Sequence, residues 1–202
     1  MVLGDAALVV ASFFLGAIPF GIVVSKLFFK RDIRAEGSGN IGAANALRSL
    51  GKAGAIAVLV LDGLKGAIPV IAGRALDGPT LAVLAALAAI AGHCFSPFLN
   101  FRGGKGVATN FGAVIALAWP AGGIFALVWL ALVVTTGFSS AGSMLASLAM
   151  APTLWFLIGP AGGIYGLISA ILIVIMHRSN IARLRAGTES VLPLFRRDKS
   201  KA

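Results

Sequence analysis

Residues 107–176 read VATNFGAVIALAWPAGGIFALVWLALVVTTGFSSAGSMLASLAMAPTLWFLIGPAGGIYGLISAILIVIM, a run without a single Asp, Glu, Lys or Arg. Across the whole chain 58% of the residues are hydrophobic, 12% are charged, and the mean hydropathy is +0.97. A soluble domain has about 25% charged residues, and no soluble globule of 202 residues could bury this much apolar surface. The composition therefore predicts an all-α fold, a polytopic integral membrane helical bundle formed by one domain over residues 1–202.

The basic residues cluster on either side of the uncharged run. Most of them fall within residues 26–52 and 177–202, and the net charge is +10. Because these clusters alternate with apolar segments, they indicate cytoplasmic loops and not a nucleic-acid surface. Cys94 is the single cysteine, which excludes a disulfide framework and a cysteine-rich zinc site. We expect Cys94 to be a packing residue, and we expect no metal and no cofactor.

The apolar segments predict seven transmembrane helices. Residues 4–25 lack a basic n-region, so we interpret them as a retained helix and not as a signal peptide. The next two spans are 53–75 and 80–97, and the uncharged run divides into four more at Trp119-Pro120, Thr136-Gly137 and Gly159-Pro160. Because 107–118 is shorter than the roughly 20 residues that cross hydrocarbon, five spans are the alternative. Either odd number places the N-terminus outside and the C-terminus in the cytoplasm.

This topology assigns four segments to the cytoplasmic side of the membrane. They are residues 26–52, 98–106, 137–142 and 177–202. Residues 196–202, at the end of the last segment, form a basic tail that we expect to be solvated near anionic headgroups.

Polar residues first interrupt the hydrophobic pattern at residues 36–48, EGSGNIGAANALR. The Gly-x-Gly-x-x-Gly spacing is a weak dinucleotide signal here, since no strand precedes it and no βαβ unit fits between the spans. Glycines nevertheless let backbone N–H groups approach an anion at a helix N-terminus. Further donors are Ser38, Asn40, Asn45 and Arg48. A glycine-rich turn whose Ser and Asn residues only cap helices is the alternative.

The second interruption is residues 92–109, GHCFSPFLNFRGGKGVAT. It is not a Walker A loop, because Lys105 is followed by Gly106 and not by the Ser or Thr that binds magnesium. Backbone donors, the helix dipole and the lysine charge can still converge on a phosphate at this turn. An ordinary interfacial lysine is the alternative.

The third interruption is residues 177–189, HRSNIARLRAGTE, directly after the last span. If the helix continues, His177 and Asn180 are three residues apart, share a face and look into the bundle. We expect an internal ion pair for Glu189. A capping histidine followed by a juxtamembrane basic stretch is the alternative.

Together the three segments resemble the signatures of the bacterial acyl-phosphate:glycerol-3-phosphate acyltransferase family, PlsY. The resemblance covers nearly the whole chain, with one departure at Ala44, where the family usually has threonine. It implies a multi-pass enzyme of the bacterial inner membrane with a cytoplasmic active site and no obligate protein partner. Its substrates would be acyl phosphate and glycerol 3-phosphate. Acyl transfer to the sn-1 hydroxyl, without a covalent acyl-enzyme, would give lysophosphatidic acid and inorganic phosphate for phospholipid biosynthesis.

Both implied substrates carry phosphate, which accounts for basic and glycine-rich turns on one side of the membrane. We predict that the catalytic residues are Ser38, Arg48, Lys105, His177 and Asn180. We predict that the substrate-binding residues are Gly39, Asn40, Asn45, Gly103, Gly104, Gly106, Ser140 and Ser143.

Two charges fall inside the second predicted span. A charge within a span costs roughly 2.5–3.5 kcal/mol on insertion scales, and Asp62 and Lys65 are three residues apart, so we expect them to pair as a support for the site. The competing function is a membrane transporter for organic phosphate anions. The polar motifs argue against a transporter, because they lie on one side of the membrane and not along a midplane pathway.

Overall fold

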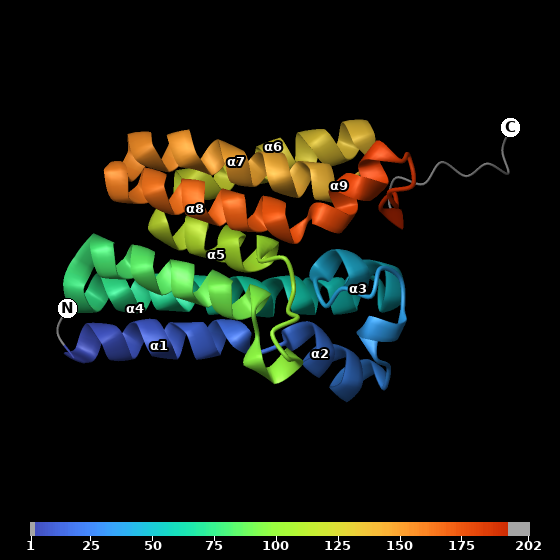
Figure 1. Ribbon diagram of the computed structural model, residues 1–202, viewed down its shortest axis with the longest axis horizontal. Helices are drawn as coiled ribbons and strands as arrows, with labels where there is room; N and C mark the ends of the chain where they lie inside the picture. Colours follow the sequence, from blue (N-terminus) through green and yellow to red (C-terminus); the bar gives the residue numbers. More distant parts are fainter. Residues whose placement is uncertain (1–2, 194–202) are drawn as a thin grey trace, which may run out of the picture.

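The structure, a computed structural model, describes residues 3–193, so the predicted basic tail at 196–202 lies outside the described part. The described residues are helical and contain no strand (Figure 1). The α-helices are α1 (Leu3–Ala17), α2 (Phe20–Phe29), α3 (Ala43–Ser49), α4 (Gly51–Cys94), α5 (Val107–Leu117), α6 (Trp119–Thr136), α7 (Ser139–Ile158), α8 (Pro160–Met176) and α9 (Arg178–Arg185). Two short 3-10 helices are η1 (Ile33–Ala35) and η2 (Pro97–Leu99).

The long helix α4 folds back on itself at Asp77 and Gly78 (Figure 1). Gly78 has φ +77° and ψ −156°, a conformation that is open essentially only to glycine, and the Pro79 that follows has no N–H for a helical hydrogen bond. A β-carbon at Gly73 would touch the backbone of Ala82, so the two arms of α4 pack closely. The break lies where the sequence predicted the connection between the second and third spans.

The first predicted span is not one continuous helix. The sequence predicted a single helix over residues 4–25, but α1 ends at Ala17, α2 begins at Phe20, and the two helices are bent by 42°. Pro19 is the physical cause, because it lacks a donor and disfavours helical geometry at the preceding residue. The Lys65 ammonium donates to the carbonyl of Ile18 at 2.8 Å, which satisfies a backbone group that the break exposes.

Among the residues that the structure describes, three helical segments are long and apolar enough to cross a membrane, namely Gly51–Leu99, which contains α4, together with α6 and α7. The number rises to five if each bent pair counts as one span. The bent pairs are α1 with α2 and α8 with α9, while α5 is a shorter apolar helix. Large apolar side chains such as Ile71, Leu127 and Ile171 are exposed on the outside of the bundle, as expected for a surface in contact with lipid. The count of seven spans and their orientation stay predictions.

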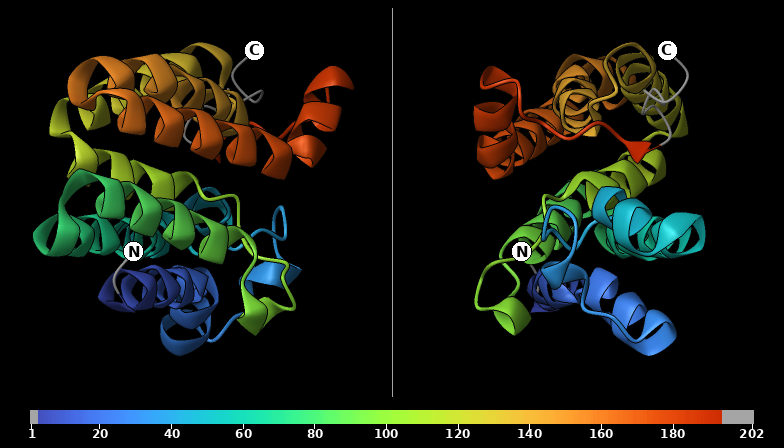
Figure 2. Two further views of the ribbon diagram at one scale, coloured as in Figure 1. Left: turned by 60° about the vertical axis from the view of Figure 1, so that its left-hand side comes forward. Right: turned by 90° about the vertical axis from the view of Figure 1, so that its right-hand side faces the viewer.

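The helices pack in the order α1, α4, α5, α6, α7 and α8, with α5 in the middle (Figure 2). Close approach at the central interface depends on small residues: a β-carbon at Gly112 would collide with the backbone of Gly63, and one at Gly66 with the backbone of Thr109. The arrangement brings α3, α9 and the segment between α4 and α5 to one end of the bundle (Figure 1). The three polar motifs therefore meet at that end.

Candidate active site

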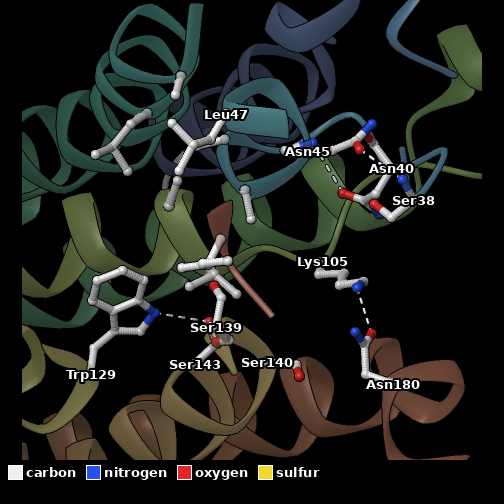
Figure 3. Close-up of a pocket in the computed structure, with 18 of the residues that line it drawn as sticks. Ser38, Asn40, Asn45, Leu47, Lys105, Trp129, Ser139, Ser140, Ser143 and Asn180 are labelled. Atoms are coloured by element: carbon white, nitrogen blue, oxygen red, sulfur yellow. Dashed lines mark hydrogen bonds between the residues drawn. The ribbon is translucent and has the colours of Figure 1, made fainter. Parts of the chain in front are cut away.

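A cavity of about 750 Å³ lies where the three polar motifs meet (Figure 3). Its wall contains these members of the predicted site: Ser38, Asn40, Asn45, Arg48, Lys105, Gly106, Ser140, Ser143, His177 and Asn180. Gly39, Gly103 and Gly104 lie outside the wall, and the last two shape the turn that carries Lys105. The motifs are far apart in the sequence, so their convergence is a property of the fold.

Asn45 organises the first motif from within. Its side chain is buried, and its amide nitrogen donates to the carbonyls of Ile33, Glu36 and Asn40 at 2.8–3.0 Å. Its amide oxygen accepts the backbone N–H of Ser38 at 2.8 Å. Asn45 therefore ties the loop into one shape, and the side chains of Ser38 and Asn40 lie at the rim of the cavity (Figure 3).

The second motif is a turn whose backbone is fixed by the end of α4. The N–H groups of Gly103 and Gly104 donate to the carbonyls of Cys94 and His93, both at 3.0 Å. Gly106 has φ +79°, a left-handed conformation that favours glycine, and it precedes the first residue of α5. Lys105 lies between Gly104 and Gly106, and the turn thus directs its side chain into the cavity. Cys94 is fully buried in the core, as the sequence predicted.

A chain of short polar contacts joins Lys105 to the third motif. The Lys105 ammonium donates to Asn180 Oδ1 at 2.5 Å, and Asn180 Nδ2 donates to Glu189 Oε1 at 2.6 Å. Ser140 donates to the same carboxylate oxygen at 2.7 Å. Arg183 Nε lies 2.7 Å from Glu189 Oε2, so the predicted internal ion pair of Glu189 is confirmed.

Burial controls the charge of these groups. It lowers the pKa of Lys105 to about 8, although the nearby Glu189 carboxylate acts in the opposite direction. Burial raises the pKa of Glu189, but hydrogen bonds from Ser140, Asn180 and Arg183 outweigh it, and the net pKa is lower than usual. Near neutral pH, therefore, Lys105 is protonated and Glu189 is ionised.

His177 stands at a bend between helices and not within a continuous helix. The sequence predicted its alignment with Asn180 on the assumption that the helix continues, but α8 ends at Met176 and α9 is bent from it by 60°. Both side chains are nevertheless buried and line the cavity. His177 Nδ1 lies 2.7 Å from the carbonyl of Ile173. Because a carbonyl only accepts, Nδ1 carries the hydrogen and Nε2 is left as an acceptor.

Burial lowers the pKa of His177 to about 4, and the positive charge of Lys105 adds to the effect. The imidazole is therefore neutral at pH 7. A neutral ring with a free Nε2 can accept a hydrogen bond from a substrate hydroxyl. Its low pKa makes it a weak base.

Ser140 and Ser143 belong to the helix α7, and the turn that precedes it is shorter than the predicted cytoplasmic segment 137–142. The turn is confined to Gly137 and Phe138, because Gly137 adopts φ +77° and ends α6, and α7 begins at Ser139. Ser143 accepts the indole N–H of Trp129 at 3.3 Å and donates to the carbonyl of Ser139 at 2.7 Å (Figure 3).

Arg48 connects the first motif with Ser190, the residue that follows the third motif. It extends from α3, and one guanidinium nitrogen donates to the carbonyl of Ser190 at 3.2 Å. The other half of the cavity is apolar and runs between α4, α5 and α6. Its wall includes Ile56, Leu59, Phe111, Phe125 and Leu130.

The predicted pair of Asp62 and Lys65 is confirmed, with 2.8 Å between the ammonium and carboxylate groups. Sequence reasoning missed that Asp62 also approaches His93, whose Nδ1 lies 3.8 Å from the carboxylate, and that both residues line the cavity. It also missed Trp129, Arg183 and Ser190. His93 precedes the glycine-rich turn in the second motif, but its neighbourhood with Asp62 depends on the fold-back of α4.

Comparison with known proteins identifies the family of the chain. The family model described as glycerol-3-phosphate acyltransferase matches residues 6–187. The chain is 49% identical to the glycerol-3-phosphate acyltransferase of Roseobacter denitrificans over 181 residues, covering 89% of this chain and 90% of that one. It is 45% identical to the protein of the same name from Rhodopseudomonas palustris strain HaA2, covering 92% and 93% of the two chains.

Solved structures give the same result. The crystal structure of PlsY (YgiH), an integral membrane glycerol 3-phosphate acyltransferase, in its glycerol 3-phosphate form aligns with a TM-score of 0.90 at 34% identity, over 96% of this chain and all of that one. The lysophosphatidic acid form aligns with a TM-score of 0.88 at the same identity. The integral membrane fold that the composition predicted is thereby confirmed, and the chain belongs to the glycerol-3-phosphate acyltransferase family of the PlsY type.

Proposed function

We propose that this enzyme transfers a fatty acyl group from acyl phosphate to the sn-1 hydroxyl of glycerol 3-phosphate and releases lysophosphatidic acid and inorganic phosphate. The observation that carries the proposal is the two-sided cavity. Lys105 and Arg48 lie at its polar half, while Ile56, Leu59 and Phe111 line its apolar half. One space thus offers cations to phosphate groups and an apolar wall to an acyl chain. The related structures with glycerol 3-phosphate and with lysophosphatidic acid support the choice of acceptor and product.

The acyl donor follows from the chemistry that the cavity offers. An acyl phosphate is a mixed anhydride with a good leaving group, so the enzyme needs mainly to neutralise phosphate charge and align the acceptor. Lys105, whose ammonium contacts the neutral Asn180 side chain and lies near the Glu189 charge, is suited to the first task. The hydroxyl of Ser38 and the side-chain amide of Asn40, which both line the cavity, add neutral donors.

In the proposed reaction the acceptor hydroxyl oxygen attacks the carbonyl carbon and forms a tetrahedral intermediate. The intermediate collapses with cleavage of the bond to the phosphate oxygen, and the hydroxyl proton passes to a phosphate oxygen. His177 Nε2 accepts a hydrogen bond from the hydroxyl and orients it, and Asn180 holds the ammonium of Lys105. The phosphate of the donor thus serves as the proton acceptor.

We propose no covalent acyl-enzyme. A serine nucleophile needs an adjacent base. Two of the cavity serines, Ser140 and Ser143, have no strong base in their described contacts, because the carboxylate next to Ser140 also accepts from Asn180 and Arg183, which lower its pKa. Ser140 donates to Glu189, and Ser143 donates to the carbonyl of Ser139. His177 directs its Nδ1 to the backbone of Ile173.

The activity test uses purified protein in detergent with acyl phosphate and glycerol 3-phosphate. We expect release of inorganic phosphate and formation of lysophosphatidic acid, also in the presence of EDTA. Acyl-CoA and acyl carrier protein serve as control donors and should give no product. Turnover of acyl-CoA at a comparable rate would refute the donor assignment, and intact substrates in detergent together with uptake by sealed vesicles would support a transporter.

We further propose that the cavity faces the cytoplasm, on the basis of the basic clusters on the motif-bearing segments. In a Cys94→Ala background, cysteines at the exposed positions Arg102 and Ser179 should react only with reagents that reach the cytoplasm. A cysteine at the exposed Thr80 should react from outside. Labelling of Arg102→Cys and Thr80→Cys from the same side would overturn this arrangement.

A further inference from the structure

His93 lies directly on the turn that carries Lys105. A β-carbon at Gly104 would overlap the His93 imidazole, with Cδ2 of the ring 3.0 Å away and Nε2 and Cε1 nearer still. The carbonyl of the same histidine accepts the N–H of Gly104 at 3.0 Å. His93 thus holds Gly104 by its backbone and covers it with its side chain.

The opposite edge of the imidazole faces a buried ion pair. His93 Nδ1 lies 3.8 Å from Asp62 Oδ1, and Asp62 in turn lies 2.8 Å from the Lys65 ammonium. Each of these three residues is at most 4% exposed. Lys65 also donates to the carbonyl of Ile18 and lies 5.6 Å from the ring centroid of Phe20.

The three side chains therefore connect the break between α1 and α2, both arms of α4, and the glycine turn. Apolar replacement of a buried ion pair is often neutral or stabilising, so stability alone does not account for this pair. We infer that His93, held by the ion pair of Asp62 and Lys65, is a positioning residue that fixes the Gly103-Gly104-Lys105 turn and thereby the Lys105 ammonium. The inference rests on the proposed function in treating Lys105 as a phosphate ligand.

The geometry argues against His93 as a base. Its Nε2 lies against Gly104, within the space that a β-carbon there would take, so the turn limits the room for a substrate at this nitrogen although His93 lines the cavity. Its Nδ1 has no hydrogen-bond partner among the described residues and faces Asp62. The ring acts through the turn and not on the reacting atoms.

The test is a reciprocal substitution of His93 and Gly104. Gly104→Ala should lower kcat/KM by about 10²-fold, the loss that misplacement by about 1 Å can cause. His93→Ala should also lower it, but adding His93→Ala to Gly104→Ala should raise activity at least tenfold above Gly104→Ala alone, because the new methyl group fills the space of the ring. If the loss of kcat/KM in the double variant equals the product of the two single losses, the inference is wrong, because residues in contact are expected to be non-additive.

His93→Phe separates positioning from direct chemistry. Phenylalanine keeps a ring over Gly104 and removes both nitrogens, so at least a tenth of the wild-type activity should remain. If the folded His93→Phe protein is as inactive as His93→Ala, the inference is wrong. Tyr165→Phe is the control: it removes a buried 2.7 Å hydrogen bond to Asn110 that involves neither His93 nor Gly103-Gly104-Lys105, and it should leave KM and kcat unchanged.

A second readout does not depend on acyl transfer. The pH dependence of Lys105 modification by an amine reagent, followed by mass spectrometry, reports its pKa, which burial lowers to about 8. The groups that face Lys105 are Glu189, Arg183, Arg48, His177 and Asn180. In His93→Ala the loosened turn should admit water and raise this midpoint, whereas Tyr165→Phe should not. An unchanged titration midpoint of Lys105 in His93→Ala would contradict the inference. Absence of acyl transfer in the wild-type protein would instead refute the proposed function, and the midpoint could still be measured.

Discussion

Two pairs of glycines at opposite ends of the bundle serve different physical purposes. At one end, Gly78 and Gly159 have φ of +77° and +81°, and a β-carbon at either would meet nothing within 4 Å. At the other end, Gly103 and Gly104 have no positive φ, but a β-carbon at either would collide with His93. The first pair supplies backbone conformation for helix connections. The second pair supplies space for other groups that press on the turn.

The presence of glycine does not by itself identify a functional turn. The groups that pack against the glycine do. A connection needs only to reverse the chain, and solvent or lipid can surround it. A phosphate-binding turn must hold a charge at a defined point, so other groups of the protein pack against its backbone and fix its position. At the cavity end these groups are the carbonyls of His93 and Cys94 and the His93 ring.

The largest effect should come from Lys105, the charge that this turn positions. Lys105→Ala should lower kcat by about 10²–10³-fold, as does removal of one preorganised group that stabilises developing charge. Lys105→Arg should recover only part of the activity, because the planar guanidinium does not match the ammonium contact with Asn180. Acyl transfer assays on both purified variants provide the measurement. Activity of Lys105→Ala within threefold of wild type would contradict the role of the turn.

Alanine substitution at each end tests the comparison of glycines directly. Gly103→Ala should lower kcat/KM by about 10²-fold, because its methyl group would meet the carbonyls of His93 and Cys94 and displace Lys105. Gly78→Ala should leave kcat/KM unchanged but cost about 1–3 kcal/mol of stability, because its backbone conformation suits only glycine. Kinetic assays combined with thermal unfolding in detergent distinguish the two effects. Similar kinetic losses in both variants would break the comparison.

The pH dependence of kcat/KM should show a smaller effect, which also depends on the charge of Lys105. Burial lowers the pKa of Lys105 to about 8, and only the protonated amine binds phosphate as a cation. The value of kcat/KM should therefore be constant below this pKa and fall by up to about tenfold for each pH unit above it. The Lys105→Arg variant is the control, since arginine stays charged and its profile should lack this alkaline limb. A wild-type profile that stays flat to pH 10 would argue against a charge requirement at Lys105.

Much of the fold could be predicted from hydropathy. The uncharged run and its breaks at Trp119-Pro120, Thr136-Gly137 and Gly159-Pro160 lie within two residues of the observed ends of α5 to α8. The bend at Pro19 was missed, because mean hydropathy is the same on both sides of a proline kink. The length of a membrane span also gives no information on whether a helix is straight.

The candidate site was predictable where its residues share a motif and not where the fold brings them together. Lys105, His177 and Asn180 could be selected because each interrupts an apolar pattern at a helix end. The approach of Asp62 to His93 could not, since the two residues are 31 positions apart and meet only through the reversal at Gly78. Sequence spacing reports neighbours along one helix, whereas this contact joins the two arms of α4.

The smallest effect should come from conservative variants of His177. They test whether His177, like the glycine turn, acts by positioning groups and not by proton transfer. Burial lowers the pKa of His177 to about 4, and Nδ1 donates to Ile173, so the ring is a weak base with one free acceptor. Proton transfer by a well-tuned side chain contributes about 10²–10⁴-fold, and a large loss in His177→Ala alone would not separate base catalysis from positioning.

His177→Asn and His177→Gln make that separation, because an amide accepts and donates hydrogen bonds but is not a base near pH 7. If His177 orients the acceptor hydroxyl, at least one of them should keep activity within about tenfold of wild type, with a pH profile that stays flat below the pKa of Lys105, as expected for the wild type. Steady-state kinetics over pH 5 to 9 on folded protein provide the measurement. If both amides are as inactive as alanine while still binding glycerol 3-phosphate, and if a wild-type ionisation near the usual histidine pKa disappears in them, His177 is the base. The donor phosphate would then not be the proton acceptor, and the cavity end would combine a positioned charge with a tuned base.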